Sequence, residues 1–192
     1  DRKFIFVEVE NYEIGGPGTS AFKCKEYLQR PFYLTTADCI LKDKLPLLDR
    51  NWLGVFPTSY PEKYSTAKVE DDKVVKFNNK SVDGYQDAFI GIAGIWDYEI
   101  FWKELYSYRV TNEIVSAFYN PEQYNTLKTK QLGWLDTGNL DDLNTAKEYF
   151  GDKPLSLYKE TSEITYKVGD KFIKFNADKN INSNKAIRAR VL

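Results

Sequence analysis

Residues 31–40 read PFYLTTADCI, and this stretch organises the interpretation of the whole chain. Phe32, Tyr33 and Leu34 form a short apolar run that is typical of a buried strand in a parallel sheet. Asp38 follows that run after a brief turn. Open α/β sheets bind their ligands just beyond the carboxyl ends of their strands. We therefore predict that Asp38 lies in a ligand site, where its carboxylate offers the oxygen ligands that Mg²⁺ prefers.

A second junction between an apolar stretch and a loop carries another acid. Residues 133–139 read GWLDTGN, so Asp136 follows an apolar stretch and Gly138 permits close approach of the main chain. A divalent cation is held by more than one carboxylate or phosphate. Asp38 and Asp136 are therefore candidate ligands of one Mg²⁺ ion if the fold brings them together.

The remaining pattern alternates strand-like and helix-like segments, which is typical of an α/β fold. We predict a Rossmann-like, mixed but mostly parallel sheet flanked by helices over residues 1–150, and a small β-hairpin and helix appendage over residues 151–192. Strands are expected at residues 4–9, 32–34, 53–57, 67–70, 74–77, 88–95, 126–128, 132–135, 164–168 and 171–175. Helices are expected at residues 19–28, 97–105, 112–119 and 139–150.

A glycine-rich turn lies between the first predicted strand and the first predicted helix. Gly16, Pro17 and Gly18 precede Thr19 and Ser20, either of which can cap that helix. Such a turn exposes main-chain N–H groups and lets a ligand approach closely. An ordinary tight turn remains the alternative, because the spacing is neither that of GxGxxG nor that of a P-loop.

Composition excludes several classes of protein. Basic and acidic residues balance at 27 against 28, which argues against a nucleic-acid binder held by bulk charge. No apolar run approaches the roughly 18 residues of a membrane helix, and no signal peptide is visible, so a cytoplasmic protein is expected. The absence of histidine excludes catalytic triads and zinc sites that use it. Cys24 and Cys39 lack the spacing of a disulfide scaffold or zinc site, and we assign both to the core.

These motifs resemble those of bacterial nucleotidyltransferases with a GT-A-like fold, which join a nucleoside monophosphate to a phosphorylated sugar or metabolite. The resemblance runs from about residue 4 to residue 150. Its most specific piece is WLDTGNLDDLNTAKEYF at residues 134–150, which begins with the family's W-x-D-x-G segment, and TTAD at residues 35–38 adds to it. It implies Mg²⁺ as cofactor, with Asp38 and Asp136 as catalytic metal ligands. It further implies nucleotide binding by Gly16, Pro17, Gly18, Thr19 and Ala37, orientation of the acceptor phosphate by Lys80, and acceptor binding by Lys76, Phe89, Gly91 and Trp134.

Two departures from the family bear on the substrate. The family has Glu-Lys-Pro where this chain reads Asn79-Lys80-Ser81, which suggests an unusual acceptor. Residues 159–180 resemble the opening strands of choline-kinase-like domains that are fused to some of these transferases in capsule clusters. The resemblance therefore implies transfer of CMP from CTP to phosphorylated glutamine, choline or a similar amine, with release of pyrophosphate, in capsule or surface polysaccharide biosynthesis.

Alternatives stay open at this point. A sugar-1-phosphate nucleotidyltransferase would keep the same metal site and use UTP, dTTP or GTP. An inactive nucleotide-binding module is the second alternative, because the family's Gly-rich triphosphate loop would precede Asp1. No methionine occurs, even at position 1, so a fragment or a processed product is expected. A glycosyltransferase is disfavoured because no Asp-x-Asp motif occurs. The expected partners are CTP or another nucleoside triphosphate and a phosphorylated acceptor, with a homodimer left open.

Overall fold

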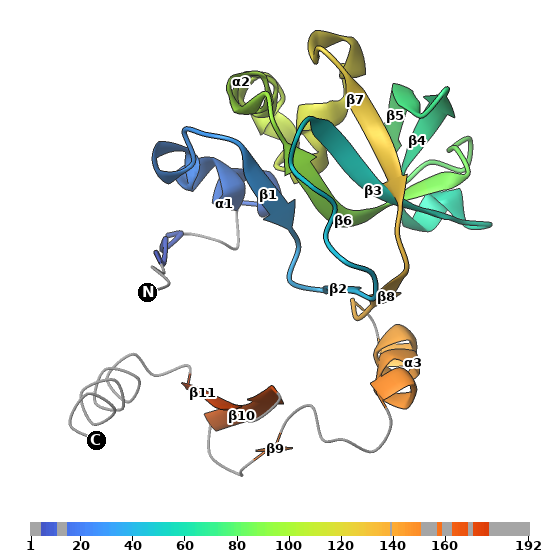
Figure 1. Ribbon diagram of the computed structural model, residues 1–192. Coiled ribbons are helices and arrows are strands. Elements are labelled where there is room, and N and C mark those ends of the chain that lie inside the picture. Colours follow the sequence, from blue (N-terminus) through green and yellow to red (C-terminus); the bar gives the residue numbers. More distant parts are fainter. Residues whose placement is uncertain are drawn as a thin grey trace. The chain divides into compact units, whose positions relative to one another are not determined.

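The fold is taken from a computed structural model of the chain (Figure 1). It divides into two compact units, Asp1–Asn139 and Leu140–Leu192, and each is described by itself. The helix at residues 140–150 falls in the second unit in this division, and the predicted domain boundary at residue 150 stays a prediction. The structure describes residues 5–10, 15–138, 140–150, 157–158, 163–168 and 171–176.

Unit 1 is built on a six-stranded sheet with the strand order β1-β6-β3-β7-β5-β4 (Figure 1). Because β4 also pairs with β6, the pairings of β6, β3, β7, β5 and β4 close into a ring. The strands of this sheet are β1 (Phe32–Thr35), β3 (Asn51–Pro57), β4 (Ser65–Glu70), β5 (Lys73–Asn79), β6 (Asp87–Ile95) and β7 (Leu127–Gln131).

The prediction of a mostly parallel sheet is wrong. Within this six-stranded sheet, β3 and β7 pair in parallel, whereas the other pairings of described strands are antiparallel. The apolar run at Phe32 belongs to β1, which pairs with β6 in antiparallel register and leaves Tyr33 41% exposed. An apolar run indicates burial but carries no information on strand direction, because direction is set by the connections between strands.

The first predicted strand is also wrong where it can be assessed. Residues 5–9 form no strand, and the Phe6 side chain is 94% exposed. Phe4 lies outside the described residues. The strands predicted near residues 53–57, 67–70, 74–77 and 88–95 are confirmed by β3, β4, β5 and β6.

The two central strands are buried on both faces, which explains their near-continuous apolar sequences. In β3, Leu53 packs into the larger core and Trp52 into a smaller cluster on the other face. In β6, Phe89 and Ala93 face the larger core, and Ile90 faces the smaller cluster. Alternate residues of a strand point to opposite faces, so each strand supplies both clusters.

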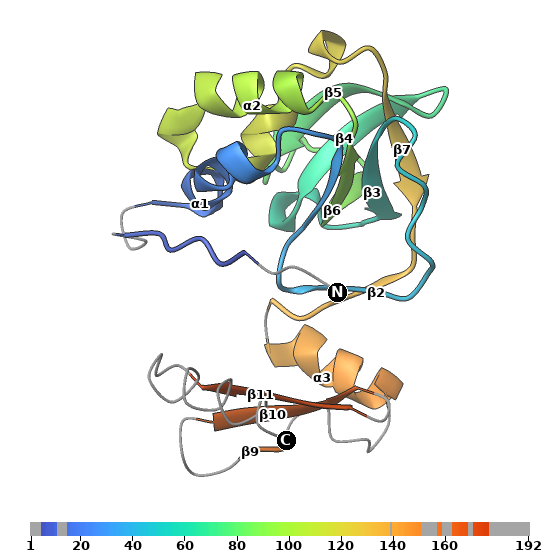
Figure 2. The same ribbon diagram turned by 60° about the vertical axis from the view of Figure 1, so that its left-hand side comes forward.

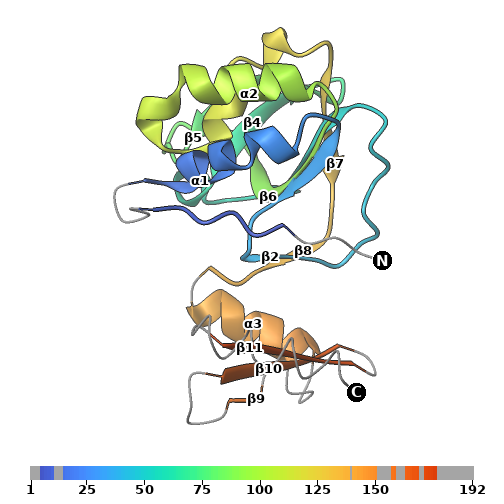
Figure 3. The same cartoon turned by 90° about the vertical axis from the view of Figure 1, so that its left-hand side faces the viewer.

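Helices cover the face that carries the larger core. Figures 2 and 3 both show α1 (Pro17–Lys23) beside α2 (Tyr98–Ser107). Phe101 and Trp102 of α2 pack against Phe32 of β1. No helix in the described part of the chain is long and apolar enough to cross a membrane. Short 3₁₀ turns lie at η1 (Lys25–Tyr27), η2 (Pro61–Lys63), η3 (Arg109–Thr111), η4 (Ile114–Phe118) and η5 (Pro121–Gln123).

A two-stranded ribbon packs against the smaller cluster. It pairs β2 (Cys39–Leu41) with β8 (Trp134–Asp136) in antiparallel register. Cys39, Leu41 and Trp134 of this ribbon contact the cluster that contains Trp52. The ribbon continues directly from the end of β1, so it fixes the loop that carries Asp38.

Unit 2 contains one helix, α3 (Leu140–Phe150), and a three-stranded antiparallel sheet in its described part. The strands are β9 (Leu157–Tyr158), β10 (Glu163–Val168) and β11 (Lys171–Asn176), in the order β11-β10-β9. The pairing of β10 with β11 confirms the hairpin predicted from the sequence. Asn139, predicted to cap α3, and the tail from residue 177 lie outside the described residues.

Candidate metal centre

The structure brings together the two acids that the sequence singled out. Asp136 ends β8 and is the register partner of Cys39, which directly follows Asp38. The main-chain N–H of Thr137 donates to the carbonyl oxygen of Asp38 at 3.0 Å, and the Thr137 hydroxyl donates to the same oxygen at 3.1 Å. Two loops that are nearly 100 residues apart in sequence are therefore bonded to each other beside both carboxylates.

Gly138 defines how closely the two carboxylates converge. A Cβ atom added to Gly138 would lie 3.2 Å from Asp136 Oδ1 and 3.3 Å from Asp38 Oδ2. The two oxygens are therefore separated by no more than the sum of these distances. Because Gly138 has no side chain, one oxygen of each carboxylate borders the space that a Cβ atom would occupy.

The thiol of Cys39 responds to the same two charges. Burial raises the pKa of the Cys39 thiol to about 11, and the negative charges of Asp38 and Asp136 contribute to this rise. Both carboxylates thus lie close enough to the Cys39 sulfur to disfavour a negative charge on it. The thiol stays protonated at neutral pH, and Cys39 packs against the smaller core cluster as the sequence predicted for a core residue.

The Asp136 carboxylate is oriented by groups on both of its oxygens. The main-chain N–H of Gly138 donates to Oδ1 at 2.8 Å, and the hydroxyl of Tyr64 lies 3.4 Å from Oδ2 as a long hydrogen bond. The Tyr64 ring also packs edge-to-face on Trp134, with ring centroids 6.1 Å apart. Tyr64 was missed by the sequence analysis, because it lies in a loop without a motif and 72 residues from Asp136.

The donor set suits Mg²⁺ that is shared with a ligand. No group of three or more His, Cys, Asp or Glu side chains that could hold a metal ion occurs among the described residues. Two carboxylates alone do not fill an octahedral shell. Mg²⁺ commonly takes one or two carboxylates and completes its coordination with water and substrate phosphates. Asp38 and Asp136 therefore fit a metal ion whose remaining coordination positions are filled by water and by the phosphate of a ligand.

The glycine-rich turn has a packing role in the structure. Gly18 is buried, and its main-chain N–H donates to the carbonyl oxygen of Asn112 at 2.8 Å. A Cβ atom on Gly16 would collide with Asn112, and one on Gly18 would lie 2.9 Å from Glu113. The glycines therefore permit close packing on the segment that joins η3 to η4. Their predicted nucleotide binding, together with that of Pro17, stays a prediction.

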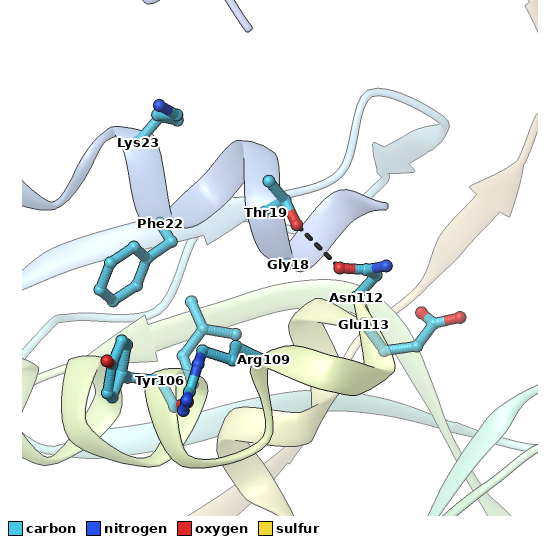
Figure 4. Close-up of a pocket in the computed structure, with 9 residues that line it drawn as sticks. Gly18, Thr19, Phe22, Lys23, Tyr106, Arg109, Asn112 and Glu113 are labelled. Atoms are coloured by element: carbon cyan, nitrogen blue, oxygen red, sulfur yellow. Dashed lines mark hydrogen bonds between the residues drawn. The ribbon is translucent and has the colours of Figure 1, made fainter. Parts of the chain in front are cut away.

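A cavity of about 290 Å³ lies beside this turn (Figure 4). Thr19 lies on its wall and donates from its hydroxyl to the side-chain oxygen of Asn112 at 2.9 Å. The guanidinium of Arg109 stacks over the ring of Tyr106 at 4.3 Å from the centroid, which leaves a mainly apolar wall next to Phe22. The residues that line the cavity are Gly18, Thr19, Phe22, Lys23, Leu105, Tyr106, Arg109, Asn112 and Glu113.

The predicted acceptor residues do not all lie in one place. Gly91 has a φ of +81°, and its carbonyl oxygen accepts the main-chain N–H of Thr36 at 2.8 Å, two residues before Asp38. Phe89 instead packs in the core against Phe77 and is only 7% exposed, so its side chain does not line an open acceptor pocket. The Phe89 side chain faces the larger core, because alternate residues of β6 point to opposite faces, and its predicted role in acceptor binding stays a prediction.

Lys80, Lys76 and Ala37 are exposed, and Trp134 is half-buried. Lys80 follows β5 with a φ of +47°, and its main-chain N–H donates to the carbonyl oxygen of Tyr64 at 3.1 Å. Lys76 lies on β5 opposite Lys68, near the surface carboxylate of Glu70. Lys80 is therefore connected through Tyr64 to the Asp136 carboxylate, whereas Lys76 is part of a surface charge cluster.

No protein-family model and no curated protein sequence matches the chain. Several solved structures do. A Bacillus anthracis protein described as a glucose-1-phosphate thymidylyltransferase is 16% identical, with a TM-score of 0.62 over 72% of this chain and 62% of that one. The CTP:phosphocholine cytidylyltransferase of Streptococcus pneumoniae is 16% identical, with a TM-score of 0.60 over 74% of this chain and 67% of that one.

The inositol-1-phosphate CTP transferase of T. maritima is 20% identical, with a TM-score of 0.51 over 68% of this chain and 59% of that one. This chain thus spans less than two thirds of the length of the first and third of these structures. At such low identity the likeness concerns the fold. The chain has the mixed α/β fold, with a sheet and flanking helices, that these nucleotidyltransferase structures share.

Proposed function

We propose that this chain carries the metal and acceptor part of a nucleotidyltransferase that transfers CMP from CTP to a small phosphorylated acceptor. The observation that carries the proposal is the convergence of the Asp38 and Asp136 carboxylates on the open space at Gly138. The fold supports it, since similar structures include two proteins described as transferases that use CTP. The proposed acceptor is an amine phosphate such as phosphoglutamine or phosphocholine, and the proposed setting is capsule biosynthesis in the cytoplasm.

The proposed reaction is an in-line displacement at phosphorus. An oxygen of the acceptor phosphate forms a bond to the α-phosphorus of CTP, and the bond from that phosphorus to the bridging oxygen of the β-phosphate breaks to release pyrophosphate. The attacking oxygen is already anionic, so no general base is required, in agreement with a chain that has no histidine. Catalysis then depends on positioning and on charge neutralisation.

Each candidate residue has a specific task in this scheme. Asp38 and Asp136 would hold Mg²⁺, which when bound neutralises charge that develops on the α-phosphate and the leaving group. Lys80 would orient the acceptor phosphate, and its link to Tyr64 keeps it connected to the metal side of the site. Lys76 is the alternative for that task. Gly91 would border the acceptor site beside the TTAD turn, where its lack of a side chain admits the side chain of Thr36.

A second candidate activity has its own support. The structure with a TM-score of 0.62 is described as a glucose-1-phosphate thymidylyltransferase, which would act on a sugar phosphate and a different nucleotide. The metal ligands would be the same two acids. The two candidates therefore differ in base and acceptor and are separated by a substrate panel.

The test measures pyrophosphate release by the complete natural polypeptide that carries this sequence, at a verified intact mass. CTP, UTP, GTP and dTTP are each combined with phosphoglutamine, phosphocholine and glucose-1-phosphate in the presence of Mg²⁺. Release with CTP and an amine phosphate is the expected result. Release with a sugar phosphate alone would favour the second candidate, and silence in every combination would contradict both.

Substitution of the acids tests the site itself. Asp38→Asn and Asp136→Asn keep the side-chain volume and should each lower turnover more than about a hundredfold without a change in the thermal midpoint. Asp83→Asn, on an exposed loop, is the matched control and should retain activity. Turnover near that of the wild type in either acid variant would remove that residue from the metal site.

A further inference from the structure

Tyr64 connects three candidate site residues that come from separate parts of the chain. Its carbonyl oxygen accepts the main-chain N–H of Lys80 at 3.1 Å, its ring packs on Trp134, and its hydroxyl faces Asp136 Oδ2 at 3.4 Å. Tyr64 follows η2 and precedes β4, with an extended backbone at φ −125° and ψ 156°. Its place is fixed from both sides by regular structure, so its side chain is held where it meets Asp136.

Among the described residues, two groups donate hydrogen bonds to the Asp136 carboxylate, and only one of these bonds can be removed by substituting a side chain. Gly138 donates from its main chain to Oδ1, and that contact is part of the loop geometry itself. Tyr64 contributes a side-chain hydroxyl at Oδ2, which a single substitution deletes. Asp38, by contrast, is exposed, and its carboxylate has no bonded donor in the described part of the chain. The orientation of the metal pair therefore depends on how Asp136 is held.

We propose that Tyr64 is a positioning residue that sets the Asp136 carboxylate for divalent-metal binding. This inference rests on the proposed function, because it takes Asp38 and Asp136 as the metal pair. Groups that hydrogen-bond a metal-ligating carboxylate fix its direction, and their loss typically weakens metal affinity by about ten- to a hundredfold.

The same contacts extend the role of Tyr64 to the acceptor side. The main-chain bond to Lys80 fixes the start of the loop that follows β5, at a residue with a φ of +47°. The tyrosine thus ties the loop of the candidate acceptor lysine to the metal carboxylate. Tyr64→Phe removes the hydroxyl that faces Asp136 and keeps the main-chain bond to Lys80 and the ring that packs on Trp134.

The experiment measures Mn²⁺ binding to the 192-residue chain by electron paramagnetic resonance of the free ion. Mn²⁺ takes the same oxygen ligands as Mg²⁺ and gives both an affinity and a number of sites. Wild type, Tyr64→Phe, Asp136→Asn and Tyr60→Phe are compared. Tyr60→Phe is the matched control, because it deletes the same hydroxyl from the same loop, where Tyr60 is 57% exposed and stacks with Lys63.

We expect Tyr64→Phe to weaken Mn²⁺ affinity about tenfold with an unchanged number of sites, and Tyr60→Phe to bind as the wild type does. A merely structural role would lower the number of competent sites and leave their affinity intact, and that outcome would overturn the proposal. Equal affinity in Tyr64→Phe and wild type, with Asp136→Asn impaired, would overturn the role of Tyr64 alone. If wild type and Asp136→Asn bind Mn²⁺ equally, Asp136 is not a metal ligand, and both the proposed metal site and the proposed role of Tyr64 are overturned.

Discussion

Gly138 shows how one residue without a side chain shapes the candidate metal centre. A Cβ atom added to Gly138 would lie within 3.3 Å of oxygens from both Asp136 and Asp38, and the main-chain N–H of Gly138 donates to Asp136 Oδ1. A side chain at this point would occupy the space that a cation requires. The residue therefore combines an orienting donor with an opening between two negative charges.

Gly138→Ala should weaken divalent-metal binding about tenfold and leave the fold intact. The added methyl would press on both carboxylate oxygens, whereas the residue is exposed and has a backbone conformation open to alanine. The measurement is Mn²⁺ affinity, together with the thermal midpoint. Gly133→Ala is the control, because a Cβ there meets Asp43 instead of the metal pair. Unchanged affinity in Gly138→Ala would contradict the placement of the cation between these carboxylates.

The sequence allowed only some members of the candidate site to be predicted. Asp38 and Asp136 stood out because each follows an apolar stretch, and the structure does bring them together. Tyr64 gave no such signal, since a tyrosine in a loop has many roles and its partner is 72 residues away. The sequence also did not show that the Phe89 side chain faces the larger core, because a strand buried on both faces does not reveal which face a residue takes.

The turn of the β4–β5 hairpin places two residues that are not glycine in the left-handed backbone region. Asp71 and Asp72 have φ values of 49° and 62°, so both central residues occupy the left-handed region that two-residue turns of this hand require. Aspartate tolerates that region better than most residues, but glycine enters it without steric cost. The carbonyl oxygen of Asp72 also accepts the main-chain N–H of Thr129 at 2.9 Å, which a substitution leaves in place.

Asp72→Gly should therefore stabilise unit 1 by about 0.5 kcal/mol, or about 2 °C in thermal midpoint. The gain from the relieved backbone exceeds the entropy that glycine adds to the unfolded chain. Differential scanning calorimetry provides the measurement. Asp83→Gly, at an exposed loop residue with a negative φ, should instead destabilise the protein. A lower midpoint in Asp72→Gly would show that the left-handed conformation is not strained at that residue.

Elements were predicted more reliably than their arrangement. The strands β3, β5 and β6 and the helix α3 lie close to the predicted ranges, because each has a periodic apolar pattern. The direction of pairing was wrong because it depends on which strands meet through long connections, and local pattern carries no such information. The strand predicted at residues 4–9 is absent from residues 5–9 for the same reason, since an apolar run forms a strand only where a partner strand is available.

At the scale of the molecule, unit 1 contains tryptophan and unit 2 does not, so fluorescence can follow unit 1 separately. The two hydrophobic clusters formed by the described residues lie in unit 1. All four tryptophans of the chain, Trp52, Trp96, Trp102 and Trp134, also lie there. Trp52 and Trp102 are buried at 0% and 2% exposure, so their emission depends on the core of that unit. Tryptophan fluorescence therefore reports unfolding of unit 1, whereas far-UV circular dichroism reports both units.

Removal of residues 140–192 should leave unit 1 folded, because the residues of both core clusters precede the cut. We expect the free energy of unfolding, measured by urea denaturation and tryptophan fluorescence, to change by less than about 1 kcal/mol. The Mn²⁺ affinity of the Asp38–Asp136 pair should not change. Leu53→Ala in the truncated chain is the control for a cooperative core, and it should cost about 2–5 kcal/mol, because Leu53 is fully buried. Loss of the fluorescence transition on truncation would show that unit 1 depends on the second unit for its stability.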